Sequence, residues 1–171
     1  MIDAIDVGDL LGRPGASKLH HIESPIDGLG TELARVRDDV PVEGDLLLEA
    51  LVEGVLVSGR LRGTVAMRCA RCLDEFERPI AVEVHELFVI ELDEEADDYP
   101  LDVEGGLLEP DQMVRDTIGV ELPFSPLCRP DCRGLCPVCG GDRNLGQCPG
   151  HVDADPRWAV LEQLTPMLDE N

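Results

Sequence analysis

The chain contains few basic and few aromatic side chains. Its 171 residues include 14 Lys and Arg against 36 Asp and Glu, so the formal net charge is −22. A field of this sign repels phosphate backbones and attracts basic surfaces. A base-stacking surface needs exposed rings, and the aromatic residues here are only Phe76, Phe88, Tyr99, Phe124 and Trp158. The composition argues against a general affinity for nucleic acid and favours a basic partner.

Long apolar runs are also missing. No window approaches the roughly 18 apolar residues of a membrane-spanning helix, and the stretch MIDAIDVGDLLGRPG lacks the basic and apolar regions of a secretory signal. We therefore expect a soluble, cytoplasmic protein. A chain of this length can bury a core without disulfides. An odd count of seven cysteines in a reducing compartment favours metal or redox chemistry over structural bridges.

Two segments with alternating apolar residues predict a pair of long antiparallel strands. Between residues 45 and 68 one parity is apolar, at Val55, Val57, Leu61, Val65 and Met67. This segment is either one half-buried strand or a hairpin with a break near Gly54 or Gly59. After the connection CARCLDE the alternation resumes, and the expected inward residues are Phe76, Ile80, Val82, Val84, Phe88 and Ile90. Cys69 and Cys72 therefore lie at the tip of a hairpin.

The remaining segments complete the prediction of an α+β fold. Residues 1–44 form an irregular segment with turn clusters, and the acidic residues 91–108 form a mobile loop. Pro110 and the apolar face after it predict a helix near 110–121. The fold is an antiparallel β core with a few short helices and a Cys-rich zinc knuckle. Its expected parts, within one folded unit, are a β-rich core over residues 1–123, the zinc knuckle segment over 124–151 and a docking helix over 152–171.

The spacing of the cysteines is typical of metal knuckles. A two-residue spacer lets both thiolates of a tight turn reach one ion, with sulfur about 2.3 Å from zinc. In CPVCGG, Pro137 presets the turn and Gly140 can adopt a positive φ. CARCL lacks that glycine and is the weaker of the two patterns. The candidate ligands are Cys69, Cys72, Cys128, Cys132, Cys136, Cys139, Cys148 and His151.

Eight candidate ligands match the need of two four-coordinate zinc ions. The preferred grouping places Cys69, Cys72, Cys128 and Cys132 on one ion, and Cys136, Cys139, Cys148 and His151 on another. One rival grouping puts Cys128, Cys132, Cys136 and Cys139 on a single ion. A second rival joins the hairpin pair, Cys69 and Cys72, to Cys136 and Cys139. One or two zinc ions therefore remain open, with His151 the least secure ligand.

The sequence predicts that such zinc would not be catalytic. A catalytic ion keeps an open position for water, whereas a four-thiolate site is closed. No H-E-x-x-H, G-x-x-x-x-G-K-[ST] or G-x-S-x-G pattern is present, and His20, His21 and His85 have no ligand-like spacing. The pair Cys69 and Cys72 lies between two strands and not at a helix amino terminus, where a redox thiol is activated. We expect no enzyme, and the competing class is a thiol redox or metal-dependent enzyme.

Arginines are interleaved with the ligands and with the first strand. Those beside the cysteines can offset thiolate charge and bond to sulfur, or they can contact RNA phosphates. The structural role is the preferred one, although one guanidinium can serve both. The candidate partner or RNA contacts are Arg60, Arg62, Arg68, Arg71, Arg129 and Arg133.

Four stretches together resemble one protein family. The strings RPGAS, CARCL, LPFSPLCRPDCRGLCPVCGG and DPRWAVLEQL, in this order, are similar to the YceD family of bacterial and plastid proteins linked to accumulation of large-subunit ribosomal RNA. The resemblance implies a cytoplasmic, non-enzymatic factor in ribosome assembly. It carries the family's ligand pattern onto Cys69, Cys72, Cys128, Cys132, Cys136 and Cys139. Cys148 and His151 fall in a stretch that varies in the family.

The residues and the resemblance combine into one hypothesis. We expect a zinc-binding factor that supports large-subunit assembly and 23S ribosomal RNA accumulation as an acidic adaptor for a basic partner. That partner is a large-subunit ribosomal protein, or its junction with precursor ribosomal RNA. The competing hypothesis is a factor that binds the RNA directly through the arginines. Direct phosphate contacts would require an affinity for naked RNA that falls steeply with added salt.

Overall fold

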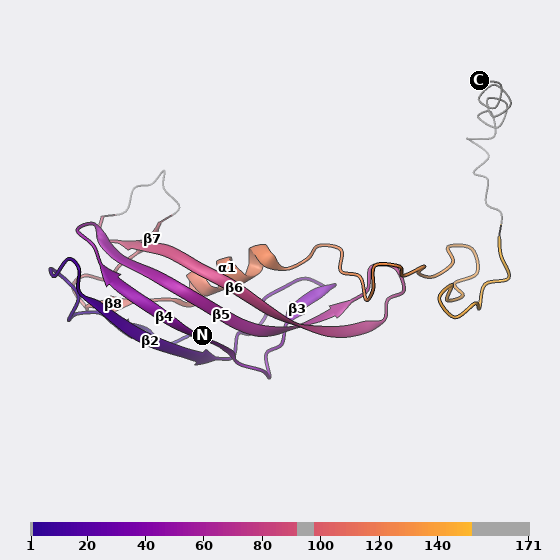
Figure 1. Cartoon of the computed structure of the whole chain (residues 1–171), viewed down its shortest axis with the longest axis horizontal. Helices are drawn as coiled ribbons and strands as arrows, with labels where there is room; N and C mark the ends of the chain where they lie inside the picture. The colour runs from indigo at the N-terminus through magenta and orange to yellow at the C-terminus, as the bar shows by residue number, and fades with distance from the viewer. Residues whose placement is uncertain (1, 92–97, 152–171) are drawn as a thin grey trace, which may run out of the picture.

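Alternating apolar residues build one large, mostly antiparallel sheet. The computed structural model describes residues 2–91 and 98–151. The sheet order is β2-β4-β5-β6-β7, with β3 paired to the far end of β5, and β1 pairs with β8 in a separate two-stranded sheet (Figure 1). The strands are β1 (Ile5–Asp6), β2 (Ser17–Ser24), β3 (Ala34–Val36), β4 (Val42–Ala50), β5 (Gly54–Arg68), β6 (Glu75–Val89), β7 (Tyr99–Pro100) and β8 (Leu107–Leu108).

The predicted long hairpin is β5 and β6. These strands pair antiparallel from Gly54 opposite Val89 to Arg68 opposite Glu75, so the cysteine pair lies in the turn between them. A turn just before Gly54 separates β4 from β5, so these two strands form a hairpin. A Cβ atom on Gly54 would overlap the carbonyl oxygen of Phe88, so glycine is required there. All five predicted inward residues of β5 are buried: Val55, Val57, Leu61, Val65 and Met67.

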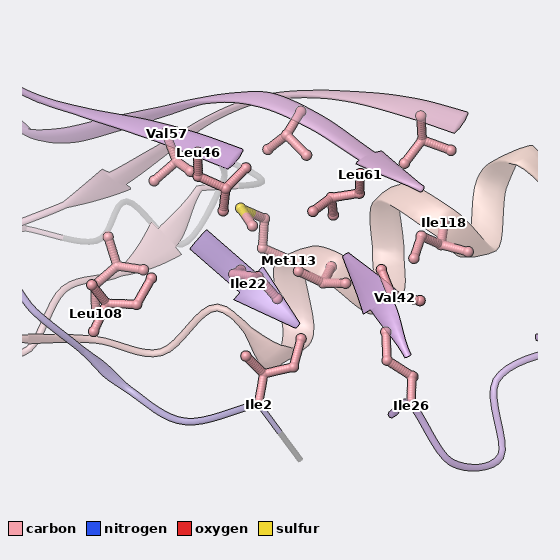
Figure 2. Close-up of a cluster of buried hydrophobic side chains, with 14 of the residues drawn as sticks. Ile2, Ile22, Ile26, Val42, Leu46, Val57, Leu61, Leu108, Met113 and Ile118 are labelled. Carbon is pink, nitrogen blue, oxygen red and sulfur yellow. The ribbon is translucent and has the colours of Figure 1, made fainter. Parts of the chain in front are cut away.

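A helix covers the inner face of the sheet. Helix α1 (Asp111–Glu121) begins after Pro110 and is capped by Leu122, just before Pro123, as the sequence predicts. Its buried residues Met113, Val114 and Ile118 pack with β2, β4 and β5 residues in one core. Figure 2 shows this cluster, in which Ile2 and Leu108 join side chains from the sheet and from α1. The core thus includes residues from Ile2 to Leu122, that is, from the whole described chain that precedes the cysteine-rich segment.

Several predictions for individual segments are wrong. The segment 1–44 is not irregular, because it contains β1, β2 and β3. The segment 91–108 is not a loop throughout its described part. Within it β7 pairs in parallel with β6, and β8 pairs with β1. Ile90 lies beyond the end of β6 and is 45% exposed, so it does not point into the core.

The predicted fold class, an antiparallel β core with a short helix, is confirmed in the described chain. Helix α1 is the one α-helix within residues 2–91 and 98–151, and it lies where the sequence predicts a helix. The predicted docking helix over 152–171 lies outside the described residues. Among the described residues, no helix is long and apolar enough to cross a membrane.

Asp111 fixes the start of α1 to the chain terminus. Its carboxylate accepts hydrogen bonds from the backbone N–H of Ile2 (2.8 Å) and from Nε of Arg115 (2.7 Å). Burial raises the pKa of Asp111, but the bonds from Arg115 and Ile2 outweigh it, and the net pKa is lowered. A carboxyl group with a lowered folded-state pKa stabilises the fold above its unfolded pKa of about 3.9, and this contribution is lost as the pH falls through the folded value.

We therefore expect Asp111→Asn to lower the free energy of unfolding by about 1 kcal/mol at pH 7. The difference from the unmodified protein should shrink as the pH falls from about 4 through the lower pKa of the folded state, because only below that value is the carboxylate protonated in both states. Urea unfolding of both proteins at the two pH values, each without metal, measures it. A difference that is the same at both pH values would contradict the assigned role of the charge.

Candidate metal centre

The tip of the β5–β6 hairpin folds into a tight cysteine turn. The N–H of Cys69 donates to the carbonyl of Asp74 and the N–H of Leu73 to the carbonyl of Cys69, both at 2.9 Å. Leu73 takes a φ of 64° to close the turn. The N–H of Arg71 points at Sγ of Cys69, 3.5 Å away. The turn therefore directs backbone dipoles at sulfur, as metal knuckles do.

The segment after α1 runs along the hairpin and docks on this turn. The N–H of Ala70 donates to the carbonyl of Pro126 (2.8 Å), and the N–H of Leu135 to the carbonyl of Arg71 (2.9 Å). The Arg71 guanidinium donates to the carbonyl of Cys132 at 2.8 Å. In Figure 1 the chain continues past the hairpin tip, away from α1. These bonds bring cysteines more than fifty positions apart to one place.

Four cysteines meet at the docked tip, and we call Cys69, Cys72, Cys128 and Cys132 the tip cluster. Their sulfur atoms all lie within 4.8 Å of one another. Cys69 and Cys132 are 3.8 Å apart, and Cys72 and Cys128 are 3.6 Å apart. A tetrahedron with zinc–sulfur bonds of about 2.3 Å has edges of about 3.8 Å, whereas a disulfide requires sulfurs about 2.05 Å apart. The geometry suits a tetrahedral ion held by four thiolates.

Most of the tip cluster is buried. Cys69, Cys72 and Cys132 are buried, Cys128 is half-buried, and Phe76 and Leu127 pack against them. Burial raises the pKa of Cys69, but hydrogen bonds from the backbone N–H groups of Cys128, Cys72 and Arg71 lower it to about 6. Burial also raises the pKa of Cys128. One thiolate therefore forms readily, and a bound cation would displace the protons of the others.

A second group lies farther along the chain, and we call Cys136, Cys139, Cys148 and His151 the distal cluster. Its ligand atoms also lie within 4.8 Å of one another, but Cys139 and His151 are exposed. Hydrogen bonds from the backbone N–H groups of Cys139 and Val138 lower the pKa of Cys136 to about 7. Three thiolates and an imidazole also form a tetrahedral zinc set. The distal cluster is thus a more open counterpart of the tip cluster.

The two cysteine turns share one backbone design. In each, the residue after the second cysteine donates its N–H to the carbonyl of the first: Leu73 to Cys69 at 2.9 Å and Gly140 to Cys136 at 2.8 Å. Both residues have a positive φ, 64° for Leu73 and 69° for Gly140. The leucine in CARCL conceals this equivalence, because the left-handed region normally selects glycine. The weaker sequence pattern therefore forms the more buried site.

The backbone of Leu73 is strained, and substitutions at this position can measure the strain. A left-handed backbone conformation destabilises a non-glycine residue by roughly 1–2 kcal/mol. The Leu73 side chain is 53% exposed, so its packing offsets little of this strain. We expect Leu73→Val to lower the free energy of unfolding by about 1 kcal/mol relative to Leu73→Gly, because a β-branched residue tolerates this region least. Both variants should keep the same zinc content. Equal stability of the two variants would contradict the strained turn.

The structure assembles the preferred ligand grouping. The tip cluster and the distal cluster contain the same eight residues in the same two sets of four. Within the described chain, neither rival grouping forms one of these sets. The tip cluster offers four sulfurs, and the distal cluster offers three sulfurs and an imidazole. These sets fit two zinc ions because thiolate and imidazole are ligands that zinc prefers.

The predicted arginines have mainly intramolecular partners. Arg60 pairs with Glu83, Arg68 with Glu75 at 3.0 Å, and Arg129 with Asp131 at 3.6 Å. Arg71 bonds the Cys132 carbonyl. The guanidinium groups near the tip cluster thus contact carbonyl and carboxylate oxygens, and sulfur receives backbone N–H groups.

The other two predicted arginines have different surroundings. Arg62 is exposed on β5, opposite Glu43 of β4. Arg133 lies beside the distal cluster, where it lines a hollow with Arg143 and His151. The structure therefore divides the six predicted arginines between the sheet and the two clusters.

Two residues that support the clusters are not predicted from the sequence. Arg78 donates to the carbonyls of Leu127 (3.0 Å) and Cys128 (3.1 Å), which holds the docked segment against β6. Asn144 accepts the N–H of Arg133 (2.8 Å) and places its amide 3.6 Å from Sγ of Cys132, so it links the two clusters. Neither residue lies in a cysteine motif. The position of Arg78 on the strand that follows CARC is the only local signal for its role.

The comparison with known families decides what this arrangement belongs to. The model of the family described as large ribosomal RNA subunit accumulation protein YceD matches residues 57–165, which include both clusters. The chain belongs to the YceD family. The family is implicated in accumulation of the RNA of the large ribosomal subunit.

Relatives of this YceD chain occur in mycobacteria. Proteins of Mycobacterium tuberculosis and Mycobacterium bovis are each 38% identical over 174 residues, which cover 96% of this chain and 83% of theirs. A Mycobacterium leprae protein is 34% identical over 169 residues, covering 93% of this chain and 76% of its own. All three are described as uncharacterized proteins. No solved structure matches the chain.

Proposed function

We propose that this YceD protein is a non-catalytic, zinc-stabilised adaptor that acts in the cytoplasm during assembly of the large ribosomal subunit. It binds a basic large-subunit ribosomal protein and so supports accumulation of 23S ribosomal RNA. The zinc ions hold the knuckle segment in a fixed shape and perform no chemistry. The family's link to large-subunit RNA supports the pathway.

The observation that carries the adaptor proposal is the pairing of the arginines. Three of the six predicted contact residues, Arg60, Arg68 and Arg129, lie against carboxylates of the same chain. An RNA phosphate would have to compete with these partners, in a molecule of net charge −22. A basic protein meets an attractive field instead, and such a field speeds encounter.

The closed tip cluster supports a structural role for its ion. Four sulfur ligands complete a tetrahedron and leave no position for a substrate or a water. Three of these cysteines are buried, with exposed fractions of 0% for Cys69, 5% for Cys72 and 2% for Cys132. The ion would therefore act by joining the hairpin tip to the segment that follows α1.

Binding experiments with purified components test the proposal. The zinc-loaded protein is mixed separately with the extracted proteins of the large subunit and with naked precursor ribosomal RNA, over a series of salt concentrations. We expect selective retention of one or a few basic ribosomal proteins and negligible binding to the naked RNA. Binding to naked RNA that falls steeply with salt would favour the direct RNA-binding function and contradict the adaptor. Retention of no ribosomal component would contradict both.

A further inference from the structure

Among the described residues, strand β2 pairs only with β4 and is a free edge of the sheet along its whole length. The N–H of Ala50 donates to Ala16 and its carbonyl accepts from Gly15, so Ala50 faces the β2 side of β4. Neighbouring residues of a strand direct their N–H groups to opposite sides. Leu48, two residues before Ala50, therefore also faces β2, and it lies opposite Lys18. Lys18 and the other even-numbered residues of β2 thus form the hydrogen bonds to β4. The N–H groups that point outward belong to Ser17, Leu19, His21 and Glu23. Within the described residues they bond no other strand.

On the opposite side of the same sheet, β7 pairs with β6 only at Phe88 and Val89, and the rest of β6 is a protected edge. The residues of β6 that form hydrogen bonds to β5 are those opposite the odd-numbered residues of β5. Pro79 lies opposite the even-numbered Thr64, so its nitrogen points outward, where no donor is needed. Glu75, Glu77 and Glu83 occupy further outward positions on β6. Proline and charge are the devices by which proteins prevent addition of a strand. Strand β2 is eight residues long and contains no proline.

The solvent face beside β2 combines an apolar spot with acidic side chains. Leu19 is 74% exposed and lies opposite the half-buried Leu47. Along the same face Glu23 lies opposite Glu43, and His21 bonds Asp45 at 2.9 Å. The one lysine of this strand, at position 18, is directed elsewhere, because its Nζ donates to Asp6 (2.7 Å) and Asp9 (3.1 Å).

We propose that the edge of β2 is the docking surface for an extended, basic segment of the partner protein, which adds to the sheet as a further strand. Backbone bonds to the outward groups of β2 would supply affinity, and the acidic face with Leu19 would select basic side chains with apolar stems. A second copy of this chain is a poor occupant, since each copy has a net charge of −22. The inference rests on the proposed basic partner and names where it binds.

A model peptide tests the edge directly. The probe is an amidated peptide of about ten residues in which arginine and valine alternate, a length typical of a strand. The control peptide has proline in place of its central valine. With the zinc-loaded full-length protein, we expect the probe to slow hydrogen exchange at the outward amides of Ser17, Leu19, His21 and Glu23, and the control peptide to bind at least about tenfold more weakly.

Three variants that leave the net charge unchanged test the role of the β2 edge. Leu19→Pro removes an outward N–H without touching the β4 bonds, and we expect it to weaken probe binding by about tenfold or more. Leu19→Ser keeps the N–H and should lose only a few-fold. Ala81 lies opposite Arg62 of β5 and, like Pro79, at an outward position of β6. Ala81→Pro therefore makes the same backbone change on β6 and should leave binding unchanged. Circular dichroism and zinc content verify that each variant folds.

The proposal is overturned by any of three results. The first is protection that maps to another part of the chain in the unmodified protein. The second is equal loss of binding in Leu19→Pro and Ala81→Pro. The third is self-association through β2, seen as concentration-dependent protection without peptide. If Leu19→Pro still retains the basic ribosomal proteins in the extraction experiment, the docking surface is wrong but the adaptor function stands. If the unmodified protein retains none, the function itself fails.

Discussion

Replacing Cys132 with serine is expected to remove one zinc ion per chain and to release residues 124–135 from the hairpin tip. Cys132 is buried and its sulfur lies 3.8 Å from that of Cys69. Serine does not supply the soft thiolate that zinc prefers, and the ion's binding energy is coupled to the docking of two distant segments. We expect the free energy of unfolding to fall by about 3–5 kcal/mol. Metal analysis and urea unfolding under reducing conditions measure both effects.

Cys139→Ser provides the matched control. Cys139 is exposed and belongs to the distal cluster, which holds only the short segment 136–151 together. This variant should also lose one zinc ion but only about 1 kcal/mol of unfolding free energy. Limited proteolysis should cut the Cys132 variant near Arg129 and Arg133, and the Cys139 variant near Arg143. Equal destabilisation by both substitutions, or a normal zinc content in either, would contradict the two-site arrangement.

Gly134→Ala is expected to weaken the tip cluster without removing a ligand. Gly134 has a φ of 70°, and a Cβ atom there would lie 2.7 Å from the carbonyl oxygen of Arg71. That carbonyl accepts the N–H of Leu135, the bond that seats the docked segment on the turn. Strain and overlap together should cost about 2–4 kcal/mol. Competition with a chromogenic chelator should show a correspondingly weaker zinc affinity at one of the two sites.

Gly140→Ala separates the overlap from the backbone strain. Gly140 has nearly the same φ, 69°, but a Cβ atom there has no neighbour within 4 Å. The substitution should therefore cost only the left-handed strain, about 1 kcal/mol, and leave the affinity of the tip cluster unchanged. If Gly140→Ala weakened zinc binding at the tip as much as Gly134→Ala, the close contact between the turn and the docked segment would not be what holds the site.

The two long strands and the ligand sets followed from local sequence signals. A period of two is visible in β5 and β6 because their apolar residues face one core and their polar residues face water. The helix over Asp111–Glu121 is bounded by prolines, which act over one or two residues. The cysteine spacings are also local, and eight ligands divide into two tetrahedral sets with none left over. The strands, the helix and the cysteine turns depend on short-range chemistry, whereas the grouping of cysteines more than fifty positions apart followed from the number of ligands.

The features that the sequence did not reveal depend on long-range pairing. Strand β2, SKLHHIES, has one buried residue, Ile22, and becomes a strand only because β4 lies beside it. Strands β7 and β8 have two residues each, too few to show a period. Arg78 gains its role from carbonyls about fifty positions away. Such contacts are created by the fold, so spacing along the chain carries no record of them.

X-ray absorption at the zinc edge tests the central claim most directly. The claim is that Cys69, Cys72, Cys128 and Cys132 saturate one ion, and that the distal cluster holds a second through three sulfurs and His151. The zinc-loaded protein should show sulfur at about 2.3 Å, about 3.5 sulfurs and 0.5 imidazole nitrogen per zinc on average, and Cys148→Ser should leave a pure four-sulfur spectrum. A water oxygen in the first shell of that variant, or fewer than four sulfurs on its ion, would contradict the account.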